Sequence, residues 1–321
     1  MSASLAFLIM LVPLAAVLLL GLAAWLGTER TGLHRGALAA RWIGLLAGGA
    51  VMIAMLALSV SGTWPGGRLG LGALTGTAPI VGAGVLILAI LIGELTIPAH
   101  GAERAGSLVP RSLGSIVPRT AAAITAGTVL LFIGLSAITS RQGSADDLGN
   151  PGRSFSYGRV LADGTQVTGS IGPFPGTWYT VPAGAAALLL LVLAVIAILV
   201  IHRRRPSLDA ADALLRSRSL VSVLGAVVLG LSLVTAAFAS FAQHAYRGAL
   251  LNAADLAPEA GPRLLGLPDA AVAAAGAAVV LAFVGSLAGM LMVCIPSVLA
   301  RGTRTRAAAA TAPAVIAGTP A

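Results

Sequence analysis

Seven long runs of apolar residues alternate with shorter polar segments along the chain. Each run contains about the 20 mostly apolar residues that an α-helix needs to cross a bilayer. The pattern therefore predicts an all-α integral membrane protein, with a bundle of seven transmembrane helices in a domain over residues 1–301 and a disordered tail over 302–321. The predicted spans cover residues 5–26, 43–60, 80–97, 121–139, 183–201, 220–241 and 271–298.

The polar segment over residues 140–182 is the longest segment between two runs, and it predicts a β-hairpin. Residues 155–161 and 165–171 have the pattern of strands. They flank Asp163 and Gly164, a pair that favours a tight hairpin turn. We expect this small hairpin to cover the outer membrane face between spans four and five, and the segment is too short for a sizeable core of its own.

Two further segments predict short helices outside the spans. Residues 249–256 follow span six and have a helical composition. Residues 207–219 begin with Ser207 in a position suited to an N-cap, and acids come early and arginines late, an order that complements the helix dipole. We expect this second helix to lie on the inner membrane surface.

Glycines within two spans are spaced for close contact between helices. Gly44 and Gly48 lie in span two, and Gly285 and Gly289 lie in span seven. This spacing allows two helix backbones to approach each other in lipid, where van der Waals packing provides much of the association energy. We expect these glycines to pack helices inside one bundle rather than to form a dimer.

The charges orient the bundle, and all twenty basic residues are arginine. With the N-terminus outside and the C-terminus in the cytoplasm, the inner segments contain 14 arginines and 4 acids, and the outer segments contain 6 of each. This asymmetry follows the enrichment of positive charge in cytoplasmic segments. No arginine precedes the first run, so we expect an anchor there rather than a cleaved signal peptide.

The four tryptophans support the same orientation independently of the arginines. Trp25 and Trp42 lie at inner ends of predicted spans, whereas Trp64 and Trp178 lie at outer ends. Amphipathic indole rings are most stable at the two membrane interfaces. All four positions therefore agree with the predicted boundaries of the spans.

Glu94 is an ionisable residue inside an apolar run, near the inner end of span three. A charge within the membrane is costly, so such a residue is usually paired, protonated or turned into the bundle. One interpretation is a structural ion pair or cap with Arg41, Arg119 or His100. The other is a carboxylate that takes part in proton- or cation-coupled transport.

Five arginines around the inner segment 202–219 are candidates for contact with anionic lipid headgroups, which attract clusters of basic residues beside a span. The alternative is a cluster that only fixes the orientation of the chain. These candidates are Arg203, Arg204, Arg205, Arg216 and Arg218.

A second group of candidates lies at the outer face. His244 follows span six and titrates near neutral pH, and Trp178 with Tyr179 begins span five. No second histidine or cysteine stands at metal-ligand spacing from His244, and Cys294 is the only cysteine in the sequence. We therefore expect no metal site and no intramolecular disulfide, and an interfacial polar cap as the role of His244.

The absence of lysine from the sequence excludes several kinds of chemistry. A retinal Schiff base, a P-loop and a pyridoxal phosphate site each require a lysine side chain. Nucleic-acid binding would require the arginines on one face of a folded domain, whereas here they sort with the membrane sides. We therefore predict no cofactor, no nucleic-acid partner and no enzymatic activity, with a lipid-modifying enzyme as a minor alternative.

Two functions from different classes fit these features. The first is a non-enzymatic component of a transport, envelope or signalling assembly in the bacterial cytoplasmic (inner) membrane. Abundant alanine, glycine and leucine with arginine in place of lysine are typical of high-GC bacterial genomes. The second is a stand-alone small-solute or proton-coupled permease that uses Glu94. A polar cavity reaching Glu94 would favour the permease, whereas a solid bundle with an exposed groove at the outer hairpin or at the inner arginine loops would favour the component.

Overall fold

A computed structural model describes most of the chain, and most of it is helical. The predicted first span and the predicted tail, residues 5–26 and 302–321, lie outside the described residues. Six of the described helices are long and apolar enough to cross a membrane, which indicates a multi-pass membrane protein. The described ranges are residues 35–60, 72–96, 117–160, 164–204, 210–256 and 270–300.

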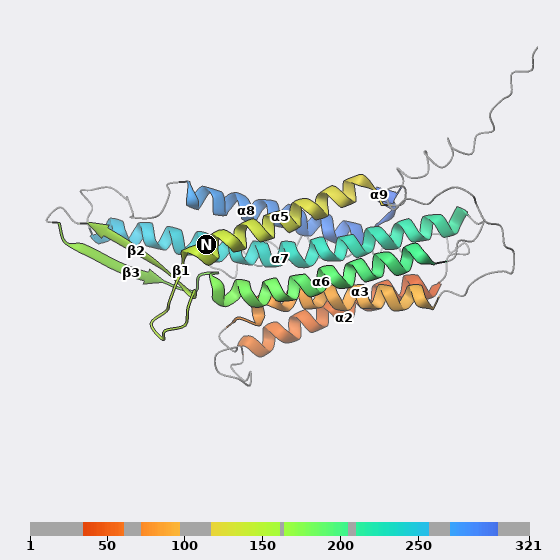
Figure 1. The fold of residues 1–321 in the computed structure, drawn as a ribbon, viewed down its shortest axis with the longest axis horizontal. Helices are drawn as coiled ribbons and strands as arrows, with labels where there is room; N and C mark the ends of the chain where they lie inside the picture. The colour runs from red at the N-terminus through yellow and green to blue at the C-terminus, as the bar shows by residue number, and fades with distance from the viewer. Residues whose placement is uncertain are drawn as a thin grey trace, which may run out of the picture.

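The six long helices lie side by side along one axis, as Figure 1 shows. We call the end that holds residues 143–176 the sheet end, and the end where α2 begins the arginine end. The count of seven spans and the assignment of these two ends to the sides of a membrane remain predictions. The helices are α2 (Arg35–Val60), α3 (Ala78–Leu95), α5 (Arg119–Gln142), α6 (Thr177–Arg203), α7 (Ala210–Leu256) and α8 (Ala271–Cys294), with the short η2 (Thr75–Thr77) and α9 (Ser297–Ala300).

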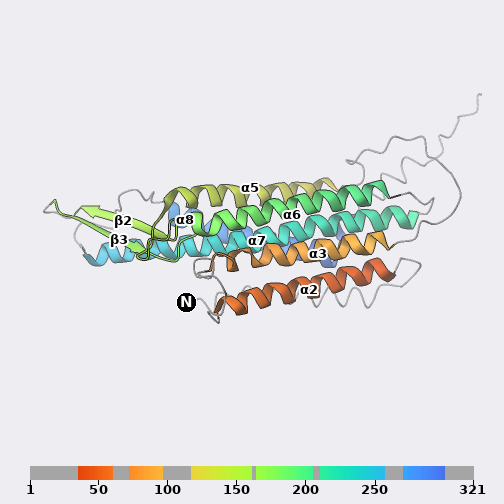
Figure 2. The same cartoon turned by 60° about the horizontal axis from the view of Figure 1, so that its bottom comes forward.

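Helix α7 is the central element of the bundle, and it lies between α6 and α3 in Figure 2. Its side chains Leu220, Val223 and Val227 are almost completely buried in the core. At 47 residues it is about 70 Å long, whereas the hydrocarbon core of a bilayer is about 30 Å thick. A large part of α7 therefore extends beyond the hydrocarbon.

The length of α7 corrects two predictions. Residues 210–219 and 249–256, predicted as separate short helices, are continuous with span six in this one helix. No proline interrupts the sequence from Ala210 to Leu256, so the backbone hydrogen bonds continue where the composition becomes polar. The predicted N-cap Ser207 lies outside the described residues.

The predicted seventh span also ends earlier than expected. Helix α8 ends at Cys294 instead of continuing to residue 298, and the short α9 follows it. Pro296 disfavours helical backbone at the preceding residue, Ile295. Ile295 accordingly has φ −129° and ψ 59°, outside the helical region.

The spaced glycines pack helices within the bundle, which confirms their predicted role. Gly48 of α2 lies against the backbone of Gly82 in α3, where an added Cβ would meet a carbonyl oxygen. In the same way, Gly289 of α8 lies against α7, where a Cβ would stand 2.6 Å from the backbone nitrogen of Leu229. Neither position has room for a side chain while the helices keep their separation.

Replacing Gly48 with alanine tests this contact, and Gly49 provides a matched control in the same helix. The new methyl group must push α3 away from α2, so we expect the free energy of unfolding to fall by about 1–3 kcal/mol. A Cβ at Gly49 meets nothing within 4 Å, so Gly49→Ala should change the stability by less than about 0.5 kcal/mol. Unfolding by SDS in mixed micelles measures both, and equal stability of the two variants would contradict the contact.

A three-stranded antiparallel sheet lies at the sheet end, in the order β1-β2-β3. Its strands are β1 (Gly143–Ser144), β2 (Ser154–Val160) and β3 (Gln166–Ile171), and Phe155 pairs with Ile171. The hairpin of β2 and β3 confirms the prediction, and Gly164 in its turn has φ +82°, which glycine adopts without strain. The two-residue strand β1 was not predicted.

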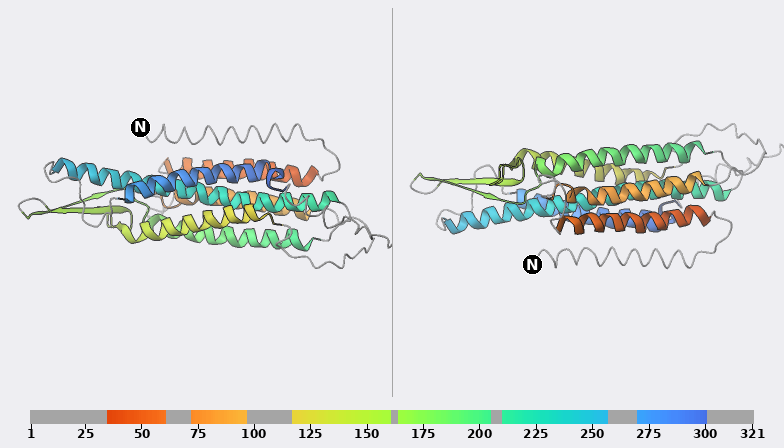
Figure 3. Two further views of the ribbon diagram at one scale, coloured as in Figure 1. Left: turned by 90° about the horizontal axis from the view of Figure 1, so that it is seen from above. Right: turned by 90° about the horizontal axis from the view of Figure 1, so that it is seen from below.

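Aromatic side chains attach the sheet to the final turns of α7. The ring of Phe155 lies 5.3 Å from that of Phe174 and 5.2 Å from that of Tyr246 on α7. Tyr246 also donates a hydrogen bond to Gln142. We call residues 143–176 together with residues 242–256 of α7 the sheet lobe. The two views in Figure 3 show that the sheet continues the long axis of the bundle beside the end of α7.

Candidate functional site

Glu94 is the centre of a buried polar cluster at the arginine end. Its side chain lies in the last turn of α3 and is 3% exposed. Ser219 of α7 donates a hydrogen bond of 2.5 Å to Oε1, and Nη1 of Arg204 donates one of 2.7 Å to Oε2. Both carboxylate oxygens therefore have partners, and they join α3, the end of α6 and α7.

The local backbone explains why Arg204 reaches this position. Arg204 is the C-cap of α6 with extended ψ of 134°, while its amide still donates to the carbonyl of Val200. The chain turns at this residue, before α7 begins. The ion pair with Glu94 is consequently well shielded, with 14% of the Arg204 side chain and 2% of the Glu94 side chain exposed.

Arg41 of α2 lies near the same carboxylate because of the register between α2 and α3. A Cβ at Gly36 would lie 3.8 Å from Oγ1 of Thr96, and one at Gly44 would lie 2.5 Å from the Cβ of Ala89. Arg41 is thus level with the last turns of α3, and helical side chains lean toward the N-terminus of their helix, here toward the arginine end. Arg41 is 7% exposed, and its charge interacts with that of Glu94.

The three residues predicted as partners of Glu94 differ in their positions relative to its carboxylate. Arg41 lies within electrostatic range, but the ion pair is made with Arg204, a residue predicted to contact lipid. Arg119 is exposed at the start of α5, and no hydrogen bond or ion pair of the described residues joins it to Glu94. His100 lies outside the described residues.

Two residues of this cluster, Arg204 and Ser219, were not predicted as partners of Glu94. One signal was available, because Glu94, Arg204 and Ser219 all stand at predicted inner ends of spans. Helix ends on the same membrane side lie at the same depth. Which of these ends are neighbours depends on how the helices pack, and the sequence pattern does not specify that packing.

The five arginines predicted to contact lipid differ in their exposure and in their partners. Arg203 is exposed on the last turn of α6, and Arg218 is partly buried. Arg204 is paired with Glu94, Arg216 is 5% exposed, and Arg205 lies outside the described residues. Headgroup contact by this group remains a prediction, and Arg203 has the exposure that such a contact needs.

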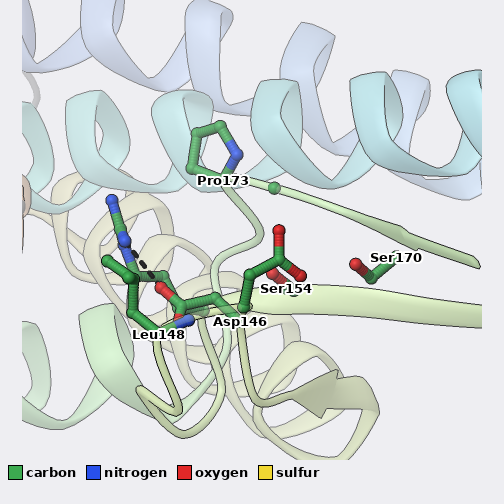
Figure 4. Close-up of a pocket in the computed structure, with 8 residues that line it drawn as sticks. Asp146, Leu148, Ser154, Ser170 and Pro173 are labelled. Carbon is green, nitrogen blue, oxygen red and sulfur yellow. Dashed lines mark hydrogen bonds and ion pairs between the residues drawn. The ribbon is translucent and has the colours of Figure 1, made fainter.

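A second polar site is a hollow of about 340 Å³ on the sheet lobe. Figure 4 shows Asp146 at its centre, with Ser154 and Ser170 from the two longer strands on one side. Leu148 is 75% exposed beside the hollow. The lining residues are Asp146, Asp147, Leu148, Arg153, Ser154, Ser170, Gly172 and Pro173.

Asp146 organises the loop that forms this hollow. It accepts hydrogen bonds from Nδ2 and the backbone amide of Asn150, from the backbone amide of Leu148 and from Nη1 of Arg153 at 2.6 Å. Hydrogen bonds from the Asn150 side chain, then from its amide and from Arg153, lower the pKa of Asp146 to about 2. The carboxylate therefore remains ionised at neutral pH, and it is a structural acceptor rather than an acid or base.

Arg153 connects the hollow to the start of α6. Its guanidinium donates to Asp146 and also to the hydroxyl of Tyr179, which is 5% exposed. The hollow is thus tied to a transmembrane helix by a polar bridge. Asp147 and Ser170 are exposed residues in the lining of the hollow.

The three candidates predicted at the outer face do not form one site. Trp178 and Tyr179 lie in the first turn of α6, whereas His244 is exposed on α7. No described interaction joins His244 to either of them. Tyr179 interacts with Arg153, and the roles of all three residues remain predictions.

Comparison with known proteins places the chain in no family, because no family model, no curated protein and no solved structure matches it. Among the described residues, no group of three histidine, cysteine, aspartate or glutamate side chains lies close enough together to hold a metal ion. A functional proposal therefore depends on the geometry of the two polar sites.

Proposed function

We propose that the protein is a non-enzymatic component of a membrane assembly, with a role in transport, the envelope or signalling. In this proposal it lies in the bacterial cytoplasmic membrane, the sheet lobe faces outward, and the arginine end faces the cytoplasm and its anionic lipids. The sheet lobe is the part that binds a partner subunit.

The continuity between the sheet lobe and α7 is the observation that supports this proposal most strongly. Phe155, Phe174 and Tyr246 hold the sheet against the same helix whose other end contributes Ser219 to the buried cluster. A lobe built in this way keeps a fixed position relative to the bundle. The hollow presents polar groups and the exposed Leu148, a combination that suits recognition of a protein surface.

The alternative, a permease that uses Glu94, has weaker support. A carboxylate that carries a proton or cation needs oxygens that can exchange partners. Both oxygens of Glu94 instead have short hydrogen bonds to Ser219 and Arg204. This arrangement favours a structural ion pair, which holds three helices together at the arginine end.

Photo-crosslinking in cells tests the binding role of the lobe. A photoreactive amino acid at Ser170 lies in the hollow, and one at Thr168 lies two residues away on the same face of β3, outside the hollow lining. We expect a specific crosslink from position 170 to another membrane or envelope subunit, and a much weaker one from position 168. Ser170→Arg should remove co-purification of that subunit, whereas Thr168→Arg should preserve it.

Reconstitution into liposomes tests the alternative. The proposed component should give no solute or proton flux above protein-free liposomes, with or without Glu94→Gln. Flux that depends on Glu94, together with no crosslink from position 170, would contradict the proposal and support the permease.

A further inference from the structure

The hollow on the sheet lobe contains three polar side chains that make no hydrogen bond or ion pair with the described residues. Two of them, Asp147 and Ser170, are exposed in its lining. The third is Ser154, which is only 5% exposed and lines the same hollow, while its carbonyl accepts a hydrogen bond from Ser144. A buried hydroxyl without a partner is costly, so the partner of Ser154 has to come from the hollow.

The register of the sheet turns the two hydroxyls toward the same space (Figure 4). Ser170 pairs with Ser156, which lies two residues after Ser154, so all three lie on the same face of the sheet. Gly172 follows β3 in the lining, and a Cβ there would lie 3.2 Å from Oγ of Ser154. The missing side chain at Gly172 therefore leaves the hydroxyl of Ser154 open to the hollow.

The lining of the hollow has a surplus of negative charge. Asp146 and Arg153 neutralise each other through a contact of 2.6 Å, and both oxygens of Asp146 also accept hydrogen bonds from its own loop. Asp147 therefore supplies a carboxylate that no lining residue compensates. The guanidinium of Arg153 in the same lining opposes a divalent cation, so a singly charged group with hydrogen-bond donors matches the hollow better.

The ammonium group of a lysine side chain matches this set of acceptors. It has three N–H donors and no acceptor, whereas the guanidinium of arginine has five donors. The three unpaired groups of the hollow are the carboxylate of Asp147 and the hydroxyls of Ser154 and Ser170. Leu148 is 75% exposed beside them, and it offers an apolar surface to the four-carbon stem of a lysine.

We propose that the hollow binds a lysine side chain of the partner protein, with Asp147 as the counter-charge and Ser154 and Ser170 as hydrogen-bond acceptors. This inference rests on the proposed partner role of the sheet lobe, and it specifies the chemistry of that partner. The chain itself contains no lysine. A second copy of it therefore cannot supply the ammonium group.

Carbodiimide crosslinking of membranes that contain the full-length protein tests the contact. The reagent activates a carboxylate, an amine in contact with it then forms an amide bond, and the activated oxygen leaves in the urea by-product. We expect mass spectrometry of the digested product to show Asp147 joined to a lysine of the subunit that position 170 captures. Any lysine in the product belongs to the partner, because this chain has none. Asp147→Asn should abolish the product, and Asp147→Glu should retain it.

Binding of the purified partner subunit provides a second measurement. Asp147→Asn removes the counter-charge without removing a described contact, so we expect binding to be about tenfold weaker. Ser154→Ala should weaken binding by about threefold to tenfold, the usual effect of one lost hydrogen bond. Ser156→Ala is the matched control and should bind normally, because Ser156 lies on the same face of β2, donates to Ser144 and does not line the hollow.

The outcomes separate this proposal from the partner role of the lobe. No product at Asp147, or equal binding by Asp147→Asn and the unsubstituted protein, would overturn the lysine site, while a crosslink from position 170 would still support the partner role. Equal weakening by Ser154→Ala and Ser156→Ala would also overturn the site, since the hydroxyls would then act only through the stability of the sheet. The absence of any crosslink from position 170 would contradict the partner role itself.

Discussion

Glu94→Gln is expected to lower the free energy of unfolding by about 3–5 kcal/mol, because it leaves Arg204, whose side chain is 14% exposed, without its counter-charge. The carboxylate is 3% exposed, so water cannot replace the lost interaction without a change in helix packing. The amide has a single oxygen, so it can accept from only one of the two positions that Ser219 and Arg204 occupy, and its NH2 group faces a donor at the other. It also supplies no charge to either Arg204 or Arg41. We expect the variant to insert into the membrane and to lose stability and function.

Unfolding by SDS in mixed micelles measures this effect, with Arg119→Gln as the control for loss of an exposed charge. The double variant Glu94→Gln with Arg204→Gln should be more stable than the sum of the two single effects indicates, with a coupling of about 0.5–3 kcal/mol. A Glu94→Gln protein as stable as the Arg119→Gln protein would show that the ion pair does not hold the helices together. Unchanged function in Glu94→Gln would remove the alternative hypothesis, in which this carboxylate takes part in transport.

Phe174→Ala is expected to destabilise the sheet lobe by about 3–5 kcal/mol, the usual cost of removing a buried aromatic ring. Phe174 has no exposed surface, and its ring contacts those of Phe155 and Tyr246. The cavity left by the ring would separate the sheet from α7. The effect should be local, because these contacts lie beyond the packed core of α3, α6 and α7.

Hydrogen exchange resolves the location of this effect. Amides of β2 and β3 should exchange faster in Phe174→Ala, whereas those in the middle of α6 should keep their protection. Leu148→Ala is the control in the same lobe, since Leu148 is 75% exposed and its truncation creates no cavity. Faster exchange throughout the bundle would mean that the lobe and the helices unfold as one unit.

The hairpin and the glycine contacts show what local patterns predict well. A turn pair with glycine between two strand-like stretches specified β2 and β3, because the positive φ at Gly164 suits that residue. Paired glycines specified close helix contact, and Gly48 and Gly289 both make it inside the bundle. Each signal lies within a few residues and needs no knowledge of the rest of the fold.

Predictions that depended on composition alone were less accurate. Polar residues at both ends of span six suggested separate short helices, whereas α7 continues through both. The strand β1 has two residues, too few for any alternating pattern, and it exists because Gly143 pairs with Phe155. Composition reports exposure to lipid or water, and a helix that extends into water changes composition without ending.

The sequence by itself determined that the chain is a helical membrane protein, because an apolar run in lipid must satisfy its backbone hydrogen bonds internally. It also identified Glu94 as a charge that needs compensation. Only the tertiary structure decided which groups provide that compensation, Arg204 and Ser219, which lie 110 and 125 residues away along the chain. Contacts at such separations depend on the order and rotation of packed helices, and these follow from side-chain packing across the whole bundle.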